Sequence, residues 1–210
     1  MSDDNKSPRP LNTSSDLFYL LLNMSDTFPI LQTERLDLVA INDSHAPGIF
    51  KLFGDERVTK YYNIVTLTEQ KETQKIIDWF QTRFAEKAGI RWGISLRGSD
   101  DIIGTIGFNN YTKQHRANIG YDLQFEHWGQ GYAAEALAAV INYGFTQLDI
   151  NRIEAEVMQG NTASEKLLEK MDFKKEGILR GWMKWNDKHY DMTMFSLLRA
   201  EYNMRNDNQK

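Results

Sequence analysis

The sequence predicts an α+β fold in which helices flank a mixed, mostly antiparallel sheet. Runs with the two-residue hydrophobic period of half-buried strands alternate with runs that have the 3.6-residue period of amphipathic helices. Three strand-like runs follow one another in the middle of the chain, and a β-hairpin closes it. Because helices do not separate every pair of strands, the class is α+β rather than regularly alternating α/β.

Capping and turn residues place the individual elements. Asn42 is a candidate N-cap for the first helix, and the spacing of Thr66 and Glu69 predicts a capping box at the start of the second, which runs on to Ala88. Polar turns separate the paired strands. Helices are therefore expected at about 45–53, 66–88, 129–148 and 161–171, and strands at 35–41, 90–96, 102–111, 117–125, 152–158, 173–183 and 188–198.

Composition indicates one globular domain with short extensions. We expect an N-terminal arm over 1–28, mobile or forming a single helix, a domain over 29–200, and a C-terminal tail over 201–210. The 210 residues include no Cys, which excludes disulfides and thiol nucleophiles, and 25 basic against 29 acidic residues give no charge pattern for nucleic acid. No apolar run approaches the roughly 20 residues that span a bilayer, so a cytoplasmic protein is expected. The four His residues lie far apart, and no metal site is predicted.

The most informative segment is 121–137, where a strand ends, Gly129 and Gly131 make a tight bend, and a helix begins at once. Main-chain N–H groups at a helix N-terminus attract phosphate groups, and glycine lets them face outward; no basic side chain lies within the bend. Two other interpretations stay open at this point. In the first, the glycines form a dinucleotide-binding fingerprint, because their spacing matches Gly-x-Gly-x-x-Ala, although the preceding strands argue against it. In the second, the glycines serve only to form the turn.

The run Trp128-Gly-Gln-Gly-Tyr-Ala-Ala-Glu-Ala resembles the acetyl-CoA diphosphate loop of the GNAT acetyltransferases, and within them the RimJ/RimL branch of ribosomal-protein N-terminal acetyltransferases. Leu31-Gln-Thr-Glu-Arg-Leu36 is similar to the opening strand of that branch, and the segment 161–173 to its second cofactor motif. The resemblance covers about 29–198. It departs from the family at Trp128, where Arg or Gln is usual, and at Asp172, where Gly is usual.

The resemblance implies the GNAT fold and acetyl-CoA as co-substrate. It implies that the pantetheine binds along the backbone of a strand that splays from its neighbour, and that the diphosphate binds at the glycine bend. An amide side chain would hold the cofactor arm, and the same side chain is suited to cap a helix. The cofactor-binding residues implied are Leu123, Gly129, Gln130, Gly131, Tyr132, Ala133, Ala134 and Asn161.

The catalytic residues are less well defined. The resemblance places Ser164 at the leaving sulfur, although Ser164 can also be an ordinary polar residue in the first turn of a helix. Leu168 occupies the position where many GNAT enzymes have a Tyr. Met183 and Asn118 replace acidic residues of the branch. The remaining candidates for a general base also have plain structural interpretations, Asp122 and Glu126 as solvent-facing strand-end residues and Asp191 as a hydrogen-bond partner in the hairpin.

The resemblance thus implies an N-acetyltransferase that moves acetyl to a primary amine by direct attack in a ternary complex. The acceptor expected from it is a protein N-terminal α-amine of the ribosomal-protein type. A small-molecule amine (a polyamine, an amino acid or a drug) and an acyl-CoA-binding sensor with little catalysis are the alternatives. Neither nucleic acid nor a membrane is expected as a partner, and the sequence leaves a monomer or a homodimer open.

Overall fold

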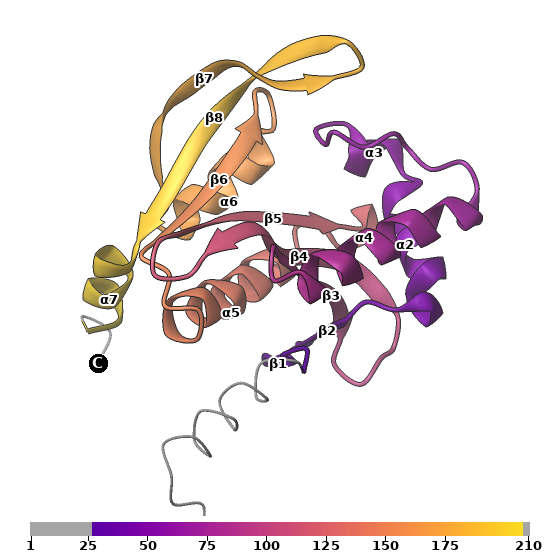
Figure 1. Cartoon of the computed structure of the whole chain (residues 1–210), viewed down its shortest axis with the longest axis horizontal. Coiled ribbons are helices and arrows are strands. Elements are labelled where there is room, and N and C mark those ends of the chain that lie inside the picture. The colour runs from indigo at the N-terminus through magenta and orange to yellow at the C-terminus, as the bar shows by residue number, and fades with distance from the viewer. Residues whose placement is uncertain (1–26, 208–210) are drawn as a thin grey trace, which may run out of the picture.

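The computed structural model describes residues 27–207, with the side chains of 27–204. An eight-stranded sheet has the order β1-β2-β3-β4-β5-β6-β8-β7 and is antiparallel except where β5 meets β6 (Figure 1). The strands are β1 (Leu31–Gln32), β2 (Leu36–Ala40), β3 (Ile90–Leu96), β4 (Ile102–Thr112), β5 (Arg116–Leu123), β6 (Arg152–Met158), β7 (Lys174–Trp185) and β8 (Lys188–Leu198). The predicted mixed sheet is confirmed.

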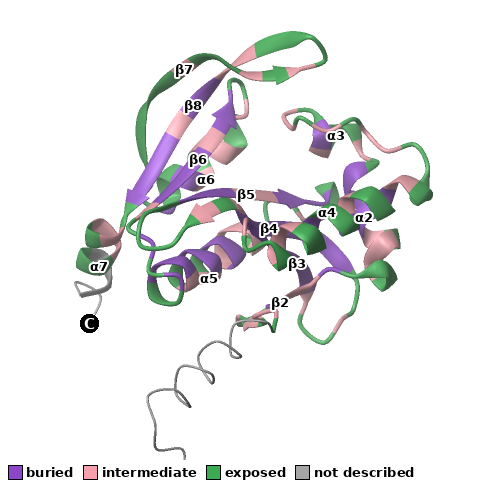
Figure 2. Cartoon of the chain, in the orientation of Figure 1, coloured by how far each residue is buried: buried purple, intermediate pink, exposed green. Residues whose placement is uncertain are grey.

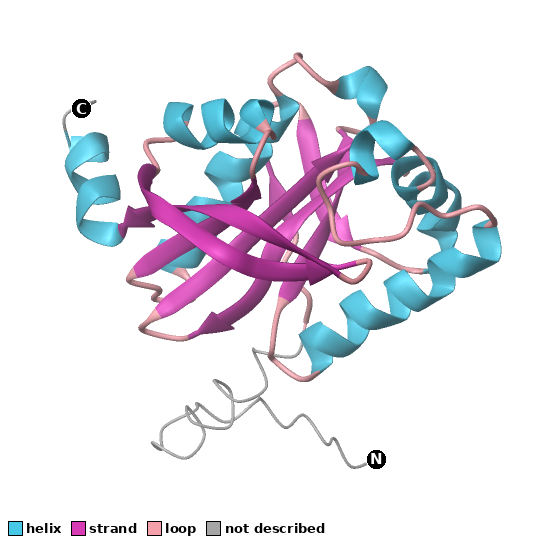
Figure 3. Ribbon diagram, turned by 90° about the horizontal axis from the view of Figure 1, so that it is seen from above, coloured by secondary structure: helices cyan, strands magenta, loops and turns pink. Residues whose placement is uncertain are grey.

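Helices cover both faces of the sheet (Figure 3). Those described are α2 (Ala46–Phe53), α3 (Glu56–Thr59), α4 (Thr73–Ala85), α5 (Tyr132–Thr146), α6 (Thr162–Lys170) and α7 (Arg199–Asp207). One buried cluster joins α5 and α6 to the centre of the sheet, and a smaller cluster joins α2 and α4 to the opposite face. The buried residues follow the sheet and the inner side of α5, whereas much of the β7–β8 hairpin is exposed (Figure 2). No helix in the described part of the chain is long and apolar enough to cross a membrane.

Several sequence expectations need correction at the boundaries. The second helix begins at Thr73, not near Thr66, because Glu69 and Glu72 form the capping box around a preceding 3-10 turn, and it ends at Ala85 rather than Ala88. The short helix α3 was not predicted, and β1 was not predicted as a separate strand, although it lies in the segment 31–36 that resembles the family's opening strand. Two or four residues give too few repeats for a periodic pattern.

The structure can be compared with the predicted domain limit more fully at the C-terminal end than at the N-terminal end. Most of the predicted N-terminal arm lies outside the described residues, although Phe28 packs against Phe84 and Trp92. Helix α7 crosses the boundary predicted for the C-terminal tail. Its Tyr202 packs on Phe145 and donates a hydrogen bond to Asn142, so this helix is attached to the body of the domain.

Candidate active site

A gap opens between β5 and β6 and forms the centre of the candidate active site. The two strands pair in parallel only from Arg116/Arg152 to Asn118/Glu154, and beyond this point each pairs with its outer neighbour alone. A bulge in β4 at Asn109 lies opposite the point where the strands part, and a bulge increases local twist. The twist carries β5 away from β6.

Main-chain groups of β5 face this gap. The N–H of Gln124 donates to Ile103 O (2.8 Å), and antiparallel pairs alternate between hydrogen-bonded and non-bonded. Leu123, the next residue back and the partner of Gly104, therefore directs its N–H and C=O away from β4. The carbonyl accepts a hydrogen bond from Trp128 Nε1 (2.7 Å), which leaves the N–H for a ligand in the gap.

The glycine bend adopts the geometry that an anion site needs. Gly129 and Gly131 have φ of 73° and 85°, the left-handed region where a side chain is strained. Gly131 is the N-cap of α5 and supplies no side-chain hydrogen bond. Because the first N–H groups of a helix have no partner within it, those of Tyr132, Ala133 and Ala134 remain available. The bend therefore has main-chain donors and a backbone geometry suited to the diphosphate expected there, and its binding stays a prediction.

A basic side chain reaches the bend from outside, although the sequence of the bend itself contains none. Arg35, at the turn between β1 and β2, donates from Nη1 to the carbonyl of Gln130 (3.0 Å) and lies over the ring of Tyr132 (4.6 Å to the centroid). The Gln130 side chain turns back to Glu126 O (2.7 Å). The bend is thus held from outside by a residue 95 positions away in the sequence.

Two hydroxyl groups meet on the α6 side of the gap. Asn161 caps α6, its Oδ1 accepting from the N–H of Ser164 (3.2 Å), so the capping role is confirmed. The hydroxyl of Ser164 lies 2.6 Å from the hydroxyl of Tyr121, which projects from β5. Burial raises the pKa of Tyr121 to about 12, so the phenol stays protonated at neutral pH. Leu168, at the usual Tyr position of the family, is fully buried.

A carboxylate not expected at the site from the sequence lies on the opposite face of the sheet. Residues of a strand alternate in direction, and Glu156 of β6 points away from the α5 face, where Ala155 and Val157 are buried. Its carboxylate accepts hydrogen bonds from Trp182 Nε1 (2.9 Å) and from Asn118 Nδ2 (3.4 Å). The alternating pattern of 152–158 was the signal that could have placed Glu156 beside the gap.

The three carboxylates considered from the sequence have other surroundings. Asp122 is buried and pairs with Arg91 and Thr105, so its expected solvent-facing position is wrong; burial raises its pKa, while Arg91 and Thr105 oppose the rise. Glu126 is exposed and pairs with Lys51. Asp191 accepts from the N–H of Gly181 (2.7 Å), as expected for a hairpin partner. Each has a structural role apart from the gap.

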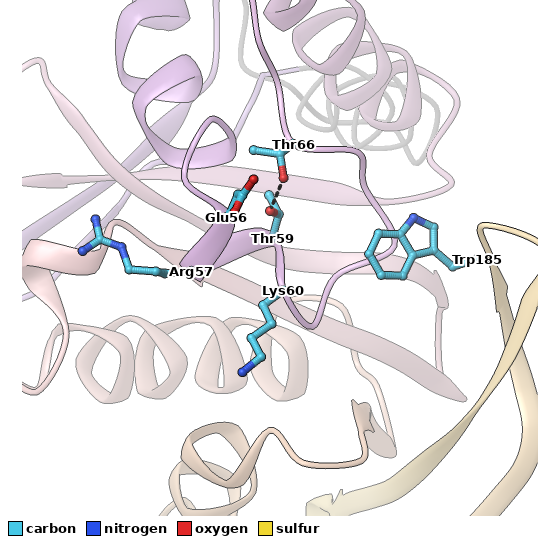
Figure 4. Close-up of a pocket in the computed structure, with 6 residues that line it drawn as sticks. All are labelled: Glu56, Arg57, Thr59, Lys60, Thr66 and Trp185. Atoms are coloured by element: carbon cyan, nitrogen blue, oxygen red, sulfur yellow. Dashed lines mark hydrogen bonds between the residues drawn. The ribbon is translucent and has the colours of Figure 1, made fainter.

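A pocket of about 440 Å³ lies on the same side as Glu156, between α3 and the tip of the β7–β8 hairpin (Figure 4). The hairpin bends toward α3 (Figure 1) at a bulge between Leu179 and Met183. Trp185 from the hairpin forms one wall, and the hydroxyls of Thr59 and Thr66, 2.6 Å apart, lie on the other side with Glu56, Arg57 and Lys60. Trp185 Nε1 is buried without a hydrogen-bond partner among the described residues.

Metal ligation is not indicated within residues 27–204, since no group of three or more His, Asp or Glu is placed to bind an ion. The site instead combines a splayed pair of strands, an uncapped helix N-terminus behind a glycine bend, and polar side chains on both sides of the gap. This combination suits a class of protein that binds an extended, diphosphate-containing co-substrate along a strand.

Comparison with known proteins identifies that class. Residues 35–174 match the family model described as an acetyltransferase (GNAT) domain. The uncharacterized N-acetyltransferase YoaA of Bacillus subtilis is 43% identical over 82% of this chain and 98% of its own length. The uncharacterized N-acetyltransferase p20 of Bacillus licheniformis is 42% identical over 82% and 97%. The chain belongs to the GNAT acetyltransferase family and is an N-acetyltransferase; enzymes of this family use acetyl-CoA.

Solved structures share the fold at lower identity. A GNAT-family acetyltransferase from Bacillus anthracis superimposes with a TM-score of 0.73 at 24% identity, covering 82% of this chain and all of that chain. RimL, a ribosomal L7/L12 alpha-N-protein acetyltransferase in complex with coenzyme A, gives 0.72 at 22% identity, covering 82% and 99%. At these identities the likeness concerns the fold alone, and the RimJ/RimL branch stays a prediction.

Proposed function

We propose that this protein transfers acetyl from acetyl-CoA to the α-amino group of a protein N-terminus, by direct attack of the amine in a ternary complex. The observation that carries the proposal is the gap between β5 and β6, which is bordered by an unpaired main-chain N–H, by a hydroxyl pair on one face and by a carboxylate on the other. The two faces give the co-substrate and the acceptor separate approaches.

The co-substrate supplies an acetyl thioester, and the residues of the gap fit the rest of it. The N–H groups from Gly129 to Ala134 hold the diphosphate, and the N–H of Leu123 pairs with the pantetheine arm or stabilises the developing oxyanion. Asn161, which caps α6 at the edge of the gap, borders the same arm. The contacts at the bend and at Leu123 use the main chain, so Trp128 and Asp172, where this sequence departs from the family, leave them intact.

Glu156 is the proposed general base. An amine attacks only in its neutral form, and an α-amino group, with a pKa of about 8, needs less help from a base than a lysine side chain at about 10.4. Trp182 and Asn118 fix the carboxylate of Glu156 on the acceptor side of the gap. There it takes a proton from the incoming ammonium group, directly or through one water.

Ser164 and Tyr121 act at the leaving group. As the C–N bond forms and the C–S bond breaks, the thiolate needs a hydrogen bond or a proton. The Ser164 hydroxyl provides the first, and the protonated phenol of Tyr121, 2.6 Å behind it, can pass a proton forward through Ser164. This pair replaces the Tyr that the family commonly places at the position of Leu168.

The pocket beside α3 supports an acceptor larger than a simple amine. It is open and combines an indole wall with hydroxyl and charged groups, which suit the main chain and side chains of a peptide. A relative from Bacillus subtilis, 33% identical over 60% of this chain and 68% of its own length, is named a putative ribosomal N-acetyltransferase. Both points favour a peptide N-terminus.

Thiol release with a panel of acceptors tests the proposal. Acetyl-CoA is first added in a thermal unfolding experiment, where a ligand at 100 times its Kd adds about 2.7 kcal/mol of stability. Peptides with free N-termini, N-terminally blocked lysine peptides, polyamines and amino acids are then compared by kcat/KM. We expect the free N-terminal peptides to be the best acceptors. A preference for polyamines or amino acids would refute the peptide acceptor, and stabilisation without thiol release from any amine would indicate a sensor.

Removing either hydroxyl of the pair is expected to slow the reaction without weakening coenzyme binding. We expect Ser164→Ala to lower kcat by about tenfold to a hundredfold, and Tyr121→Phe by about tenfold, since the phenol acts through Ser164. Because the pair acts as a unit, the double variant should lose little more than Ser164→Ala alone. Stopped-flow rates of a single turnover measure the chemical step. Losses that simply multiply in the double variant would show that the two hydroxyls act independently.

A further inference from the structure

The turn between β1 and β2 forms hydrogen bonds to a carboxylate in the first turn of α5. Both oxygens of Glu135 are engaged: Oε1 accepts from Thr33 Oγ1 (2.6 Å) and from the N–H of Arg35 (2.8 Å), and Oε2 accepts from Arg35 Nε (2.7 Å). Burial alone would raise the pKa of Glu135, but these hydrogen bonds together bring its pKa below the usual value. Glu135 is therefore negatively charged at neutral pH.

This negative charge lies close to the site proposed for a diphosphate. Glu135 is the fourth residue of α5, directly after the three whose N–H groups are available at the bend. A carboxylate in the first turn is favourable for the helix itself. It also opposes the binding of a second anion at the same helix end, unless a cation offsets it.

Arg35 is placed to offset it. Arg35 forms an ion pair with Glu135, and its Nη1 donates to Gln130 O (3.0 Å). Its Nη2 lies close to Gly131, 3.3 Å from the position that a Cβ would take on this glycine. Its guanidinium also covers the ring of Tyr132. One side chain thus contacts the carboxylate, Gln130 and Tyr132, and it lies beside Gly131.

We propose that Arg35 is a positioning residue for the co-substrate's diphosphate, because it neutralises Glu135 and fixes the carbonyl of Gln130 at the bend. This inference rests on the proposed function. It also explains why a turn of β1–β2 and a helix about 100 residues later share a set of polar contacts. The main-chain N–H groups of the bend can then receive an anion without an opposing charge beside them.

Calorimetric titration of coenzyme A into the wild type and four variants tests the role of charge. Arg35→Ala should raise the Kd by about tenfold, as expected for a charge effect at a partly buried helix end. Glu135→Gln should leave the Kd unchanged or lower it, and Arg35→Ala/Glu135→Gln should recover most of the lost affinity. The loss in Arg35→Ala should shrink at high salt. Arg97→Ala is the control, since Arg97 donates to Thr33 O (2.8 Å) in the same turn but does not contact Glu135.

The different responses expected of the two single variants separate an effect of charge from simple structural support of the bend. If the contacts only brace the bend, Glu135→Gln weakens binding as much as Arg35→Ala, the double variant does not recover, and the inference is wrong. An unchanged Kd in Arg35→Ala refutes it too. Wild-type protein that fails to bind coenzyme A would instead overturn the proposed function.

Discussion

Replacing Gly131 by Val is expected to abolish measurable coenzyme binding. The residue has φ of 85°, a region in which a β-branched side chain is strongly disfavoured, and its new Cβ would lie 3.3 Å from Arg35 Nη2. To relieve both, the main chain must rotate, and the N–H groups that face the diphosphate rotate with it. We expect the Kd for acetyl-CoA to rise by at least about a hundredfold, or about 2.8 kcal/mol. Calorimetric titration measures this change.

Gly98→Val is the matched control for this experiment. Gly98 has φ of 78°, similar to that of Gly131, and nothing lies within 4 Å of an added Cβ. It is in the turn between β3 and β4, away from the gap. The two variants should therefore lose similar free energy of unfolding from backbone strain, whereas only Gly131→Val should lose affinity. Wild-type affinity in Gly131→Val would mean that the bend does not bind the diphosphate.

Glu156→Gln should give the largest loss in the chemical step. The amide keeps the size of the side chain and can still accept from Trp182, but it cannot take a proton from the ammonium group of the acceptor. General-base catalysis typically contributes about 10²–10⁴-fold, so we expect kcat to fall by at least about a hundredfold while the Kd for acetyl-CoA stays unchanged. The loss should shrink as pH rises through the pKa of the acceptor amine, because more of the amine is then already neutral.

Two further variants test whether the loss in kcat is specific to the carboxylate of Glu156. Glu169→Gln removes a carboxylate from an exposed position of α6 and should leave kcat unchanged. Trp182→Phe removes the N–H that holds Glu156 Oε2 but keeps an aromatic ring, so kcat should fall by less than in Glu156→Gln. If Glu156→Gln retains wild-type kcat at neutral pH with the best acceptor, Glu156 is not the base.

Local features of the site could be predicted from the sequence. The bend at Gly129 and Gly131 and the cap at Asn161 depend on residues a few positions apart, and their side-chain chemistry specifies the backbone directly. The alternation within 117–125 and 152–158 likewise indicated two strands. The splay between these strands was expected only from the family resemblance, and the pairing limited to Asn118/Glu154 agrees with it.

The contacts that complete the site join distant parts of the chain, and for this reason the sequence did not reveal them. Arg35 and Glu135 are 100 residues apart, and Tyr121 and Ser164 are 43 apart. Arg91 was one polar residue in an apolar strand, and only the register of the sheet brings it to Asp122, which explains the wrong expectation for that carboxylate. The alternation within 152–158 gives only the face of the strand on which Glu156 lies. Trp182 and Asn118, which hold its carboxylate beside the gap, reach it from two other strands.

A crystal structure of the protein with bound coenzyme A is the most direct test of the central claim, that the co-substrate lies in the gap between β5 and β6 with its diphosphate at the bend. We expect density for the diphosphate within hydrogen-bonding distance of the N–H groups from Gly129 to Ala134, and density for the pantetheine beside Leu123. Coenzyme density at another site, with β5 and β6 closed against each other and the bend turned away, would contradict it.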